Sequence, residues 1–275
     1  MSECTLDQLP VNTKIVRICT TDSPLVPSFL FECHLDSYIE KRIANEGYWE
    51  PAYLNFALLN LKPGDAVIDV GGNVGAYSVP LALAVGTTGA VVAFEPVPFL
   101  AERLRQNLAL NNLGPTVQVV PAAVSDKKGR ATFFVPTGDN MGLGGLTLNN
   151  DCASQHKTID VDVVTLDDYL PTVLAPDRKI TLIKLDIQGA EPAALRGAAA
   201  TIAKHRPRIL LEFEVAYHAD FASVATGLKD FLSGLGYGLF VPSPPVLVEF
   251  NPRMPYDGGL IALPMGGRGP SGQTV

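Results

Sequence analysis

The sequence predicts an α/β fold built on a doubly wound, mostly parallel, seven-stranded Rossmann-like sheet with an antiparallel last strand. Short apolar runs alternate with helical patterns from residue 66 onward, which is typical of βαβ units. A glycine-rich turn, 71–75, follows the first apolar run, and the acid Glu95 follows the second. Because parallel strands end at the same edge of a sheet, we expect the turn and the acid to lie side by side.

Residues 1–60 are expected to form an N-terminal extension or cap. Two extended segments are followed by two segments with helical spacing, at 14–19, 29–34, 36–44 and 51–61. Pro51 suits the first turn of the second helix. The Lys-Pro-Gly-Asp turn at 62–65 then closes this section.

Residues 61–265 are expected to form the main domain, and 266–275 a flexible tail. Its seven strands are predicted at 66–70, 91–94, 117–122, 180–185, 208–213, 238–241 and 259–263. Its helices are predicted at 75–84, 99–111, 192–204 and 222–235. The alternation breaks at 131–164, where two short strands flank a glycine-rich loop, so we expect an inserted hairpin and loop there.

The bulk composition is that of an ordinary globular enzyme. The chain has 275 residues, 47% of them hydrophobic and 18% charged, with a formal net charge of -7. A nucleic-acid partner is not expected, since broad nucleic-acid binding needs a basic face. No apolar run reaches the length of a membrane span, so no membrane association is expected.

The compartment is predicted from the cysteines and the first ten residues. Four scattered cysteines form no C-x-x-C pair: Cys4, Cys19, Cys33 and Cys152. In a chain of this length they are typical of free thiols in a reducing compartment. The first ten residues contain acids and no basic n-region, which argues against a signal peptide. We therefore expect a cytoplasmic protein.

The glycine-rich turn indicates which cofactor binds. A dinucleotide fingerprint reads G-x-G-x-x-G, but counting from Gly71 places Asn73 and Ala76 where glycines are needed. Asp69, at the end of the strand, would repel a pyrophosphate and attract an ammonium group. S-adenosylmethionine carries an ammonium group and no phosphate, and its ribose hydroxyls suit Glu95. The alternative is a tight strand-to-helix turn with a solvated acid.

With these motifs the chain resembles the FkbM-type class I methyltransferases over residues 50–214. The family's D-V-G-A-N-x-G appears as Asp-Val-Gly-Gly-Asn-Val-Gly at 69–75, and its F-E-P at 94–96. Its A-x-S/G-D-x-x-G appears at 123–129, and its T-L-D-D at 165–168. The most specific motif, K-x-D-x-E-G-A-E, appears at 184–191 with Gln188 in place of the usual glutamate.

The resemblance implies S-adenosyl-L-methionine as cofactor, with S-adenosyl-L-homocysteine as product. It places the amino-acid end at the glycine turn, the ribose at Glu95, the adenine beside 122–125 and the transferred methyl group near Asp186. The cofactor-binding residues that it implies are Glu50, Asp69, Gly71, Asn73, Gly75, Glu95, Pro96, Ala123, Ser125 and Asp186.

Candidate catalytic residues follow the fourth and fifth strands of the main domain. Asp186 is expected to orient the acceptor or take its proton; alternatively, it only holds the cofactor ammonium or caps the next helix. Glu212 and Glu214 point to one face of their strand, either into the acceptor pocket or toward an arginine. His218 lies just beyond them. A divalent metal bound by these four residues is not favoured, because no metal-specific spacing is present.

Substrate contacts are expected from two further segments. The glycine-rich loop supplies Asn140, Met141 and Gly144, and its composition suits closure over a substrate. Trp49 precedes the second predicted helix and either contacts the acceptor or anchors the N-terminal extension.

The predicted function is therefore methyl transfer to a small-molecule or natural-product acceptor that is derived from a sugar, polyketide or peptide, at a hydroxyl oxygen. Nitrogen of a peptide or amide is the alternative acceptor atom. An NAD-dependent oxidoreductase is disfavoured by the missing glycine and by the absence of a Tyr-x-x-x-Lys pair. A non-catalytic adenosylmethionine-binding protein is a further alternative, and only the replacement of the family's usual glutamate by Gln188 supports it. Oligomeric state is open, with a dimer among the alternatives.

Overall fold

The structure is a computed structural model, and it describes residues 12–18, 28–147, 156–243 and 246–266. The cysteines at 4, 19 and 152 and residues 267–275 of the predicted tail at 266–275 lie outside the described residues. Cys33 is a buried free thiol. Within the described ranges, no helix has the length and apolar character needed to cross a membrane.

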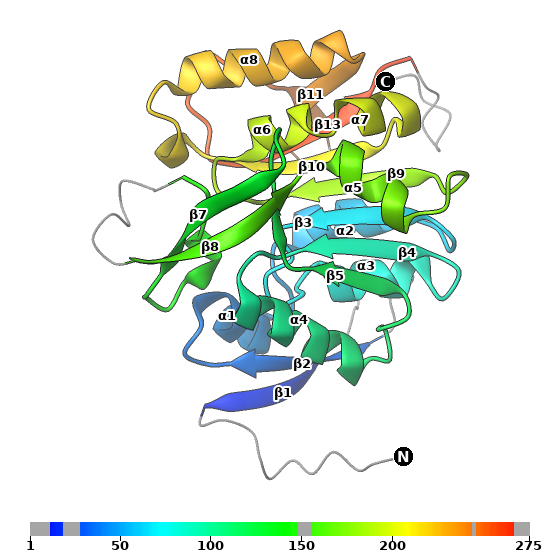
Figure 1. The fold of residues 1–275 in the computed structure, drawn as a ribbon, viewed down its shortest axis with the longest axis vertical. Helices are drawn as coiled ribbons and strands as arrows, with labels where there is room; N and C mark the ends of the chain where they lie inside the picture. The colour runs from blue at the N-terminus through cyan, green and yellow to red at the C-terminus, as the bar shows by residue number, and fades with distance from the viewer. Residues whose placement is uncertain (1–11, 19–27, 148–155, 244–245, 267–275) are drawn as a thin grey trace.

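An eight-stranded sheet forms the centre of the molecule (Figure 1), in the order β12-β11-β13-β10-β9-β3-β4-β5. Its strands are β3 (Ala66–Val70), β4 (Ala90–Phe94), β5 (Val117–Val120), β9 (Ile180–Leu185), β10 (Arg208–Phe213), β11 (Tyr237–Ser243), β12 (Val246–Glu249) and β13 (Gly258–Pro264). Neighbours from β10 to β5 are parallel, whereas β13 is antiparallel to both β10 and β11. The predicted fold class, with its antiparallel last strand, is confirmed.

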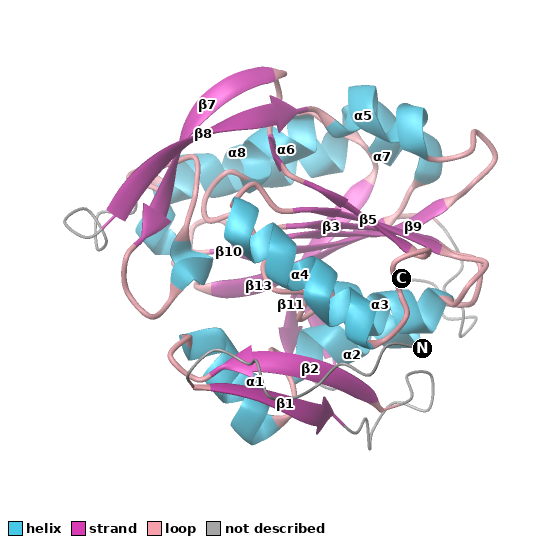
Figure 2. Cartoon of the chain, turned by 60° about the horizontal axis from the view of Figure 1, so that its bottom comes forward, coloured by secondary structure: helices cyan, strands magenta, loops and turns pink. Residues whose placement is uncertain are grey.

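Helices cover both faces of this sheet (Figure 2). One layer contains α2 (Pro51–Leu59), α3 (Ser78–Val85) and α4 (Pro98–Leu110), and the other contains α5 (Leu166–Val173), α6 (Glu191–Arg196), α7 (Ala199–His205) and α8 (Phe221–Gly234). Successive residues of a strand point to opposite faces, so Val67 packs in one core cluster and Ile68 in the other. The strand is buried on both sides, which explains its uninterrupted apolar run.

Three details of the predicted sheet and helices differ. The run at 117–122 divides at Pro121, and β6 (Ala122–Val124) joins a second sheet, β6-β8-β7, with β7 (Gly129–Pro136) and β8 (His156–Val164). The helix expected at 192–204 is two helices, α6 and α7. They separate at Gly197, where a side chain would collide with the Ser125 carbonyl oxygen 2.1 Å away. The short edge strand β12 was not predicted, because prolines precede it in the sequence.

The N-terminal region packs beside α4 (Figures 1 and 2). It consists of an antiparallel pair, β1 (Thr13–Ile18) and β2 (Phe29–His34), followed by α1 (Tyr38–Glu46). The Asn107 side-chain oxygen accepts from the Glu32 amide (2.7 Å), and its nitrogen donates to the Val74 carbonyl (2.9 Å). One buried amide of α4 therefore ties β2 to the glycine turn after β3.

We expect Asn107→Ala to lower the free energy of unfolding by about 2 kcal/mol, because it leaves a backbone donor and a backbone acceptor without partners in a buried place. Urea denaturation measures the change. The matched control is Gln106→Ala on the exposed face of the same helix, which should have little effect. Equal stability of the two variants would contradict this assignment of Asn107.

Candidate active site

The glycine turn after β3 is shaped by its contact with the end of β9. Gly71 has φ +85°, and a Cβ there would lie 2.0 Å from the Asp186 carbonyl oxygen. Both the Gly71 and the Gly72 amides donate to the Phe94 carbonyl at the end of β4, at 3.0 and 2.9 Å. Asn73 follows in a left-handed conformation with φ 47°. Only a glycine allows β3, β4 and β9 to end this close together.

Glu95, the acid after β4, is fixed beside that turn. Its Oε2 accepts from the Asn73 amide and its Oε1 from the Val97 amide, both at 2.9 Å. Glu95 is only 5% exposed, and burial raises its pKa to about 7 although the two amides act in the opposite direction. The carboxyl oxygens keep further lone pairs, so a hydroxyl ligand can still be bound.

A buried lysine links the glycine turn to the end of β9. Lys184 Nζ donates to the Gly71 carbonyl (3.2 Å) and to Asp186 Oδ2 (3.3 Å), and it lies 3.7 Å from Asp69 Oδ1. Its ammonium group also lies 5.0 Å from the centre of the Tyr77 ring. Burial would lower the Lys184 pKa, but the surrounding carboxylates, first of all Asp186, raise it above its usual range. This lysine therefore stays charged.

Asp69 lies beneath the turn and not in the wall of the pocket described below. It is fully buried, and its Oδ2 accepts from the Ser78 hydroxyl at 2.5 Å. Tyr77, next to Ser78, donates its hydroxyl to Glu50 Oε2 at 2.9 Å. Asp69 and Glu50 therefore surround Lys184 together with Asp186.

Carboxyl groups gather where β9 and β10 end. Asp186 follows β9, Glu212 is in the last part of β10, and Glu214 follows that strand. Gln188 lies between two of them, and its Nε2 donates to Asp186 Oδ1 and to Glu212 Oε2, both at 2.8 Å. Burial would raise the Asp186 pKa, but Lys184 and the hydrogen bonds lower it. For Glu212, the Asp186 charge and burial raise the pKa to about 11.

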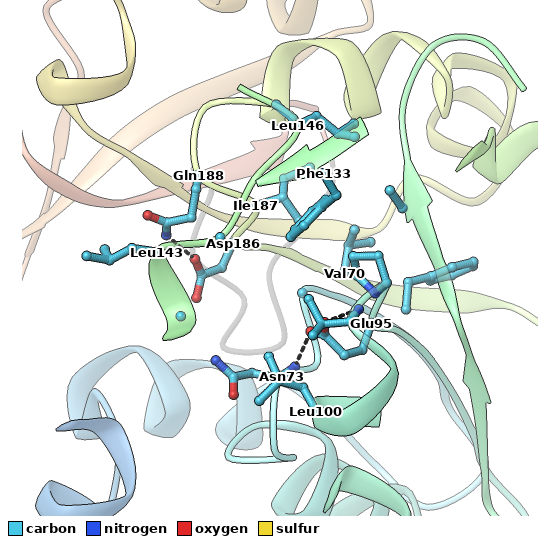
Figure 3. Close-up of a pocket in the computed structure, with 18 of the residues that line it drawn as sticks. Val70, Asn73, Glu95, Leu100, Phe133, Leu143, Leu146, Asp186, Ile187 and Gln188 are labelled. Carbon is cyan, nitrogen blue, oxygen red and sulfur yellow. Dashed lines mark hydrogen bonds between the residues drawn. The ribbon is translucent and has the colours of Figure 1, made fainter. Parts of the chain in front are cut away.

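These elements surround a pocket of about 1080 Å³, counting its open mouth. Figure 3 shows Asp186 and Gln188 across this pocket from Glu95 and Asn73. Apolar side chains form one wall; they include Val97, Leu100, Ala122, Ala123, Phe133 and Leu146. The described lining residues include carboxyl groups but no lysine, arginine or histidine. Such a lining fits a ligand with a positive charge, hydroxyl groups and a flat apolar part, and it does not fit a pyrophosphate.

The pocket is bordered by α1 and by the loop after β7. The Tyr38 amide at the start of α1 donates to the Asp139 carbonyl in that loop, at 3.0 Å. The loop contains a short 3-10 turn, Met141–Leu143. There Gly142 approaches Ile39 so closely that a Cβ would lie 2.7 Å from its side chain. Segments about a hundred residues apart in sequence thus meet at one edge of the pocket.

Most of the residues predicted from sequence line this pocket. They are Trp49, Gly71, Asn73, Glu95, Pro96, Ala123, Asn140, Gly144, Asp186, Glu212 and Glu214. Glu50 lines a small adjoining cavity together with Asp186 and Glu212. The contacts of these residues with a cofactor or acceptor stay predictions.

Four other predicted residues are not among those that line the pocket. Three of them lie outside its lining, and the side chain of the fourth is not described. Gly75 packs against Leu104, and the Ser125 amide donates to the Val164 carbonyl. The His218 ring stacks on Phe213 with 4.7 Å between ring centres, and His218 is not among the lining residues. Nothing is described for the side chain of Met141. Within the described ranges, no three His, Cys, Asp or Glu residues are arranged to hold a metal ion.

Sequence reasoning missed Lys184, Tyr77 and Phe133 as parts of the site. Lys184 stands in the K-x-D motif, so its spacing from Asp186 was a usable signal: residues two apart in a strand point to the same face. Tyr77 lies in the turn before α3 and reaches Glu50 only in the folded chain. Phe133 belongs to the inserted hairpin, whose position no motif encodes.

Comparison with known proteins identifies the family. Residues 69–239, well over half of the chain, match the family model of the methyltransferase FkbM domain. The chain belongs to the FkbM methyltransferase domain family. The predicted resemblance is thereby confirmed, and the matched region includes the glycine turn, Glu95, Asp186 and Glu212.

Individual FkbM-domain relatives are distant. The 2-O-methyltransferase NoeI of Sinorhizobium fredii is 28% identical over 158 residues, which cover 53% of this chain and 62% of NoeI. Methyltransferase sdnD of Sordaria araneosa is 26% identical over 166 residues, which cover 52% of this chain and 63% of sdnD. The chain thus spans about six tenths of the length of these curated relatives.

Solved structures of similar proteins include the methyltransferase FkbM from Methylobacillus flagellatus, with a TM-score of 0.45 and 19% identity over 76% of this chain and 50% of that one. The O-methyltransferase TomG from Streptomyces achromogenes, solved in complex with SAM, has a TM-score of 0.45 and 16% identity. That match covers 81% of each chain.

We expect Gly71→Ala to destabilise the FkbM domain by at least about 2 kcal/mol, because the left-handed conformation and the collision with the Asp186 carbonyl both oppose a side chain. Thermal or urea unfolding measures the loss. Gly138→Ala is the matched control, since a Cβ at that position meets no atom within 4 Å. An unchanged melting temperature in Gly71→Ala would contradict the close approach of β3 and β9.

Proposed function

We propose that this FkbM-domain protein transfers the methyl group of S-adenosylmethionine to a hydroxyl oxygen of a small-molecule acceptor. The observation that carries the proposal is the position of Glu95, held by the Asn73 and Val97 amides beside the glycine turn. A carboxylate in this position can accept from the hydroxyls of a ribose. Carboxyl groups around the rest of the pocket suit the positive charges of the cofactor and offer no partner to a phosphate.

Bound S-adenosylmethionine supplies an activated methyl group, so the protein mainly has to hold the acceptor in line and close to it. Glu95 holds the ribose end, and the apolar wall with Leu100, Ala123 and Phe133 suits the adenine. Asp186, at the opposite side, orients the acceptor hydroxyl and accepts its proton. We assign the remaining edge of the pocket, where the acceptor would be enclosed, to Trp49 of the proposed N-terminal cap and to Asn140 and Gly144 of the proposed inserted loop.

The acceptor class rests on relatives, because the pocket itself admits more than one. NoeI is named a 2-O-methyltransferase, and TomG an O-methyltransferase involved in tomaymycin synthesis. We infer a sugar, polyketide or peptide-derived acceptor and methylation on oxygen. A peptide or amide nitrogen is the alternative atom, and mass spectrometry of a product made with isotope-labelled methyl donor separates the two.

We expect S-adenosylhomocysteine to raise the melting temperature of the protein and NAD to leave it unchanged. A ligand at about 100 times its Kd that binds only the native state stabilises it by about 2.7 kcal/mol. Differential scanning fluorimetry compares the two ligands, with Glu95→Ala as the variant that should lose the shift. A shift with NAD alone would refute the proposed function.

We expect the affinity for S-adenosylhomocysteine to increase with pH because of Glu95. Its ionised form accepts hydroxyl hydrogen bonds best, and burial raises its pKa to about 7. Titration of one such group gives about a tenfold gain in affinity between about pH 6 and about pH 8. Isothermal titration calorimetry should find that gain in the wild-type protein and lose it in Glu95→Gln.

The matched control for the pH experiment is Glu249→Gln. Glu249 is exposed and paired with Lys229, far along the chain from the glycine turn. This variant should keep the wild-type pH dependence. The assignment of Glu95 to the ribose fails if Glu95→Gln binds S-adenosylhomocysteine as tightly as the wild-type protein at the higher pH.

A further inference from the structure

The side chain of Gln188 has a fixed orientation between two carboxyl groups. Its Nε2 donates to Asp186 Oδ1 and to Glu212 Oε2, each at 2.8 Å, and its Oε1 accepts from the Tyr217 hydroxyl. The backbone carbonyl of Gln188 accepts from the Thr147 hydroxyl at 3.2 Å. Gln188 is only 7% exposed. With the amide reversed, its oxygen would face at least one carboxyl group that has no proton to donate, so the orientation described is the favoured one.

The two carboxyl groups also interact with each other. Asp186 and Glu212 each accept from the same amide nitrogen at 2.8 Å, so the two bonded carboxyl oxygens lie no more than twice that distance apart. Two like charges this close in a buried place oppose each other's ionisation, and of the described cations only Lys184 forms an ion pair with either group. The pair therefore holds one proton.

The surrounding charges determine which partner carries that proton. Lys184 Nζ lies 3.3 Å from Asp186 Oδ2, while in the described part of the chain no lysine, arginine or histidine forms an ion pair with Glu212. Glu212 instead faces further carboxyl groups. The titratable groups that act on the pair are Glu50, Tyr77, Lys184, Glu191, Glu214 and, through Glu214, Asp257.

We propose that Asp186 and Glu212, bridged by Gln188, share one proton, which lies on Glu212 because Lys184 stabilises Asp186 as the charged partner. Gln188 acts as a positioning residue: it donates to both carboxyl groups at every pH, whereas the glutamate usual at this place would need a proton of its own. The opposite pKa shifts of Asp186 and Glu212 agree with this distribution of charge.

This assignment gives the two acids different tasks, a consequence that rests on the proposed function. When the new oxygen–carbon bond forms, the carbon–sulfur bond breaks and its electron pair stays on sulfur. The hydroxyl proton of the acceptor passes to the ionised Asp186 carboxylate. Glu212 keeps its proton and serves as a hydrogen-bond donor in the pocket.

Infrared difference spectroscopy of the protein without ligands at neutral pH tests where the proton lies. Subtracting the wild-type spectrum from that of Glu212→Gln should show the loss of one protonated carboxyl band and no loss of a carboxylate band. The control Glu249→Gln should instead lose a carboxylate band, because that exposed group is ion-paired and has a lowered pKa. Loss of a carboxylate band in Glu212→Gln would overturn the proposal.

Gln188→Glu tests the positioning role, and it is expected to fold because the related family usually carries glutamate there. A third carboxyl group between Asp186 and Glu212 should take up a proton, so the protonated carboxyl band should grow by one group. If the variant gains only a carboxylate band, Gln188 does not control the protonation of the pair. This second variant keeps the test valid if Glu212→Gln fails to fold.

Failure of this inference is distinguishable from failure of the proposed function. The infrared measurement uses neither cofactor nor acceptor, so it reports only on the shared proton. Absence of S-adenosylhomocysteine binding would refute the proposed function and leave the carboxyl pair unaffected. Binding of S-adenosylhomocysteine by a protein whose Glu212 is ionised would refute the shared proton alone.

Discussion

The site depends on the close approach of two parallel strand ends, β3 at Gly71 and β9 at Asp186. Because Gly71 has no side chain, its backbone can lie against the Asp186 carbonyl, and Lys184 can donate to the Gly71 carbonyl and to the Asp186 carboxylate at once. The glycine turn and the carboxyl groups at the end of β9 thereby form one rigid unit. A side chain at Gly71 would separate the proposed cofactor end of the pocket from its proposed reacting end.

Charge is distributed unequally around this contact. Asp69, Glu50 and Asp186 surround one buried lysine, and the pKa of Asp186, which lies 3.3 Å from its ammonium group, is lowered. Burial raises the pKa values of Glu95 and Glu50, and the Asp186 charge together with burial raises that of Glu212. Direct contact with one cation therefore distinguishes Asp186 from the other carboxyl groups whose pKa values are raised.

The central sheet and its turn were predictable because each strand of a buried parallel sheet leaves an apolar run, and each tight turn needs glycine. The missed edge strand β12 contains the apolar run Val-Leu-Val, but its side chains are exposed and prolines precede it, so it was not predicted as part of the sheet. Where the expected helix at 192–204 divides, the Ser125 carbonyl approaches Gly197 from a distant part of the chain. Contacts between distant segments leave no periodic pattern in either segment.

The sequence alone determined the fold class, the glycine turn, the acid after β4 and the acids after β9 and β10, because these depend on local pattern and on the rule that parallel strands end together. Only the tertiary structure decided that Gln188 bridges Asp186 and Glu212, that Lys184 touches Asp186 and not Glu212, and that His218 stacks on Phe213 outside the pocket lining. Those outcomes depend on side-chain directions and distances of a few ångströms. Such distances are set by the packing of the whole chain and not by the spacing of residues along it.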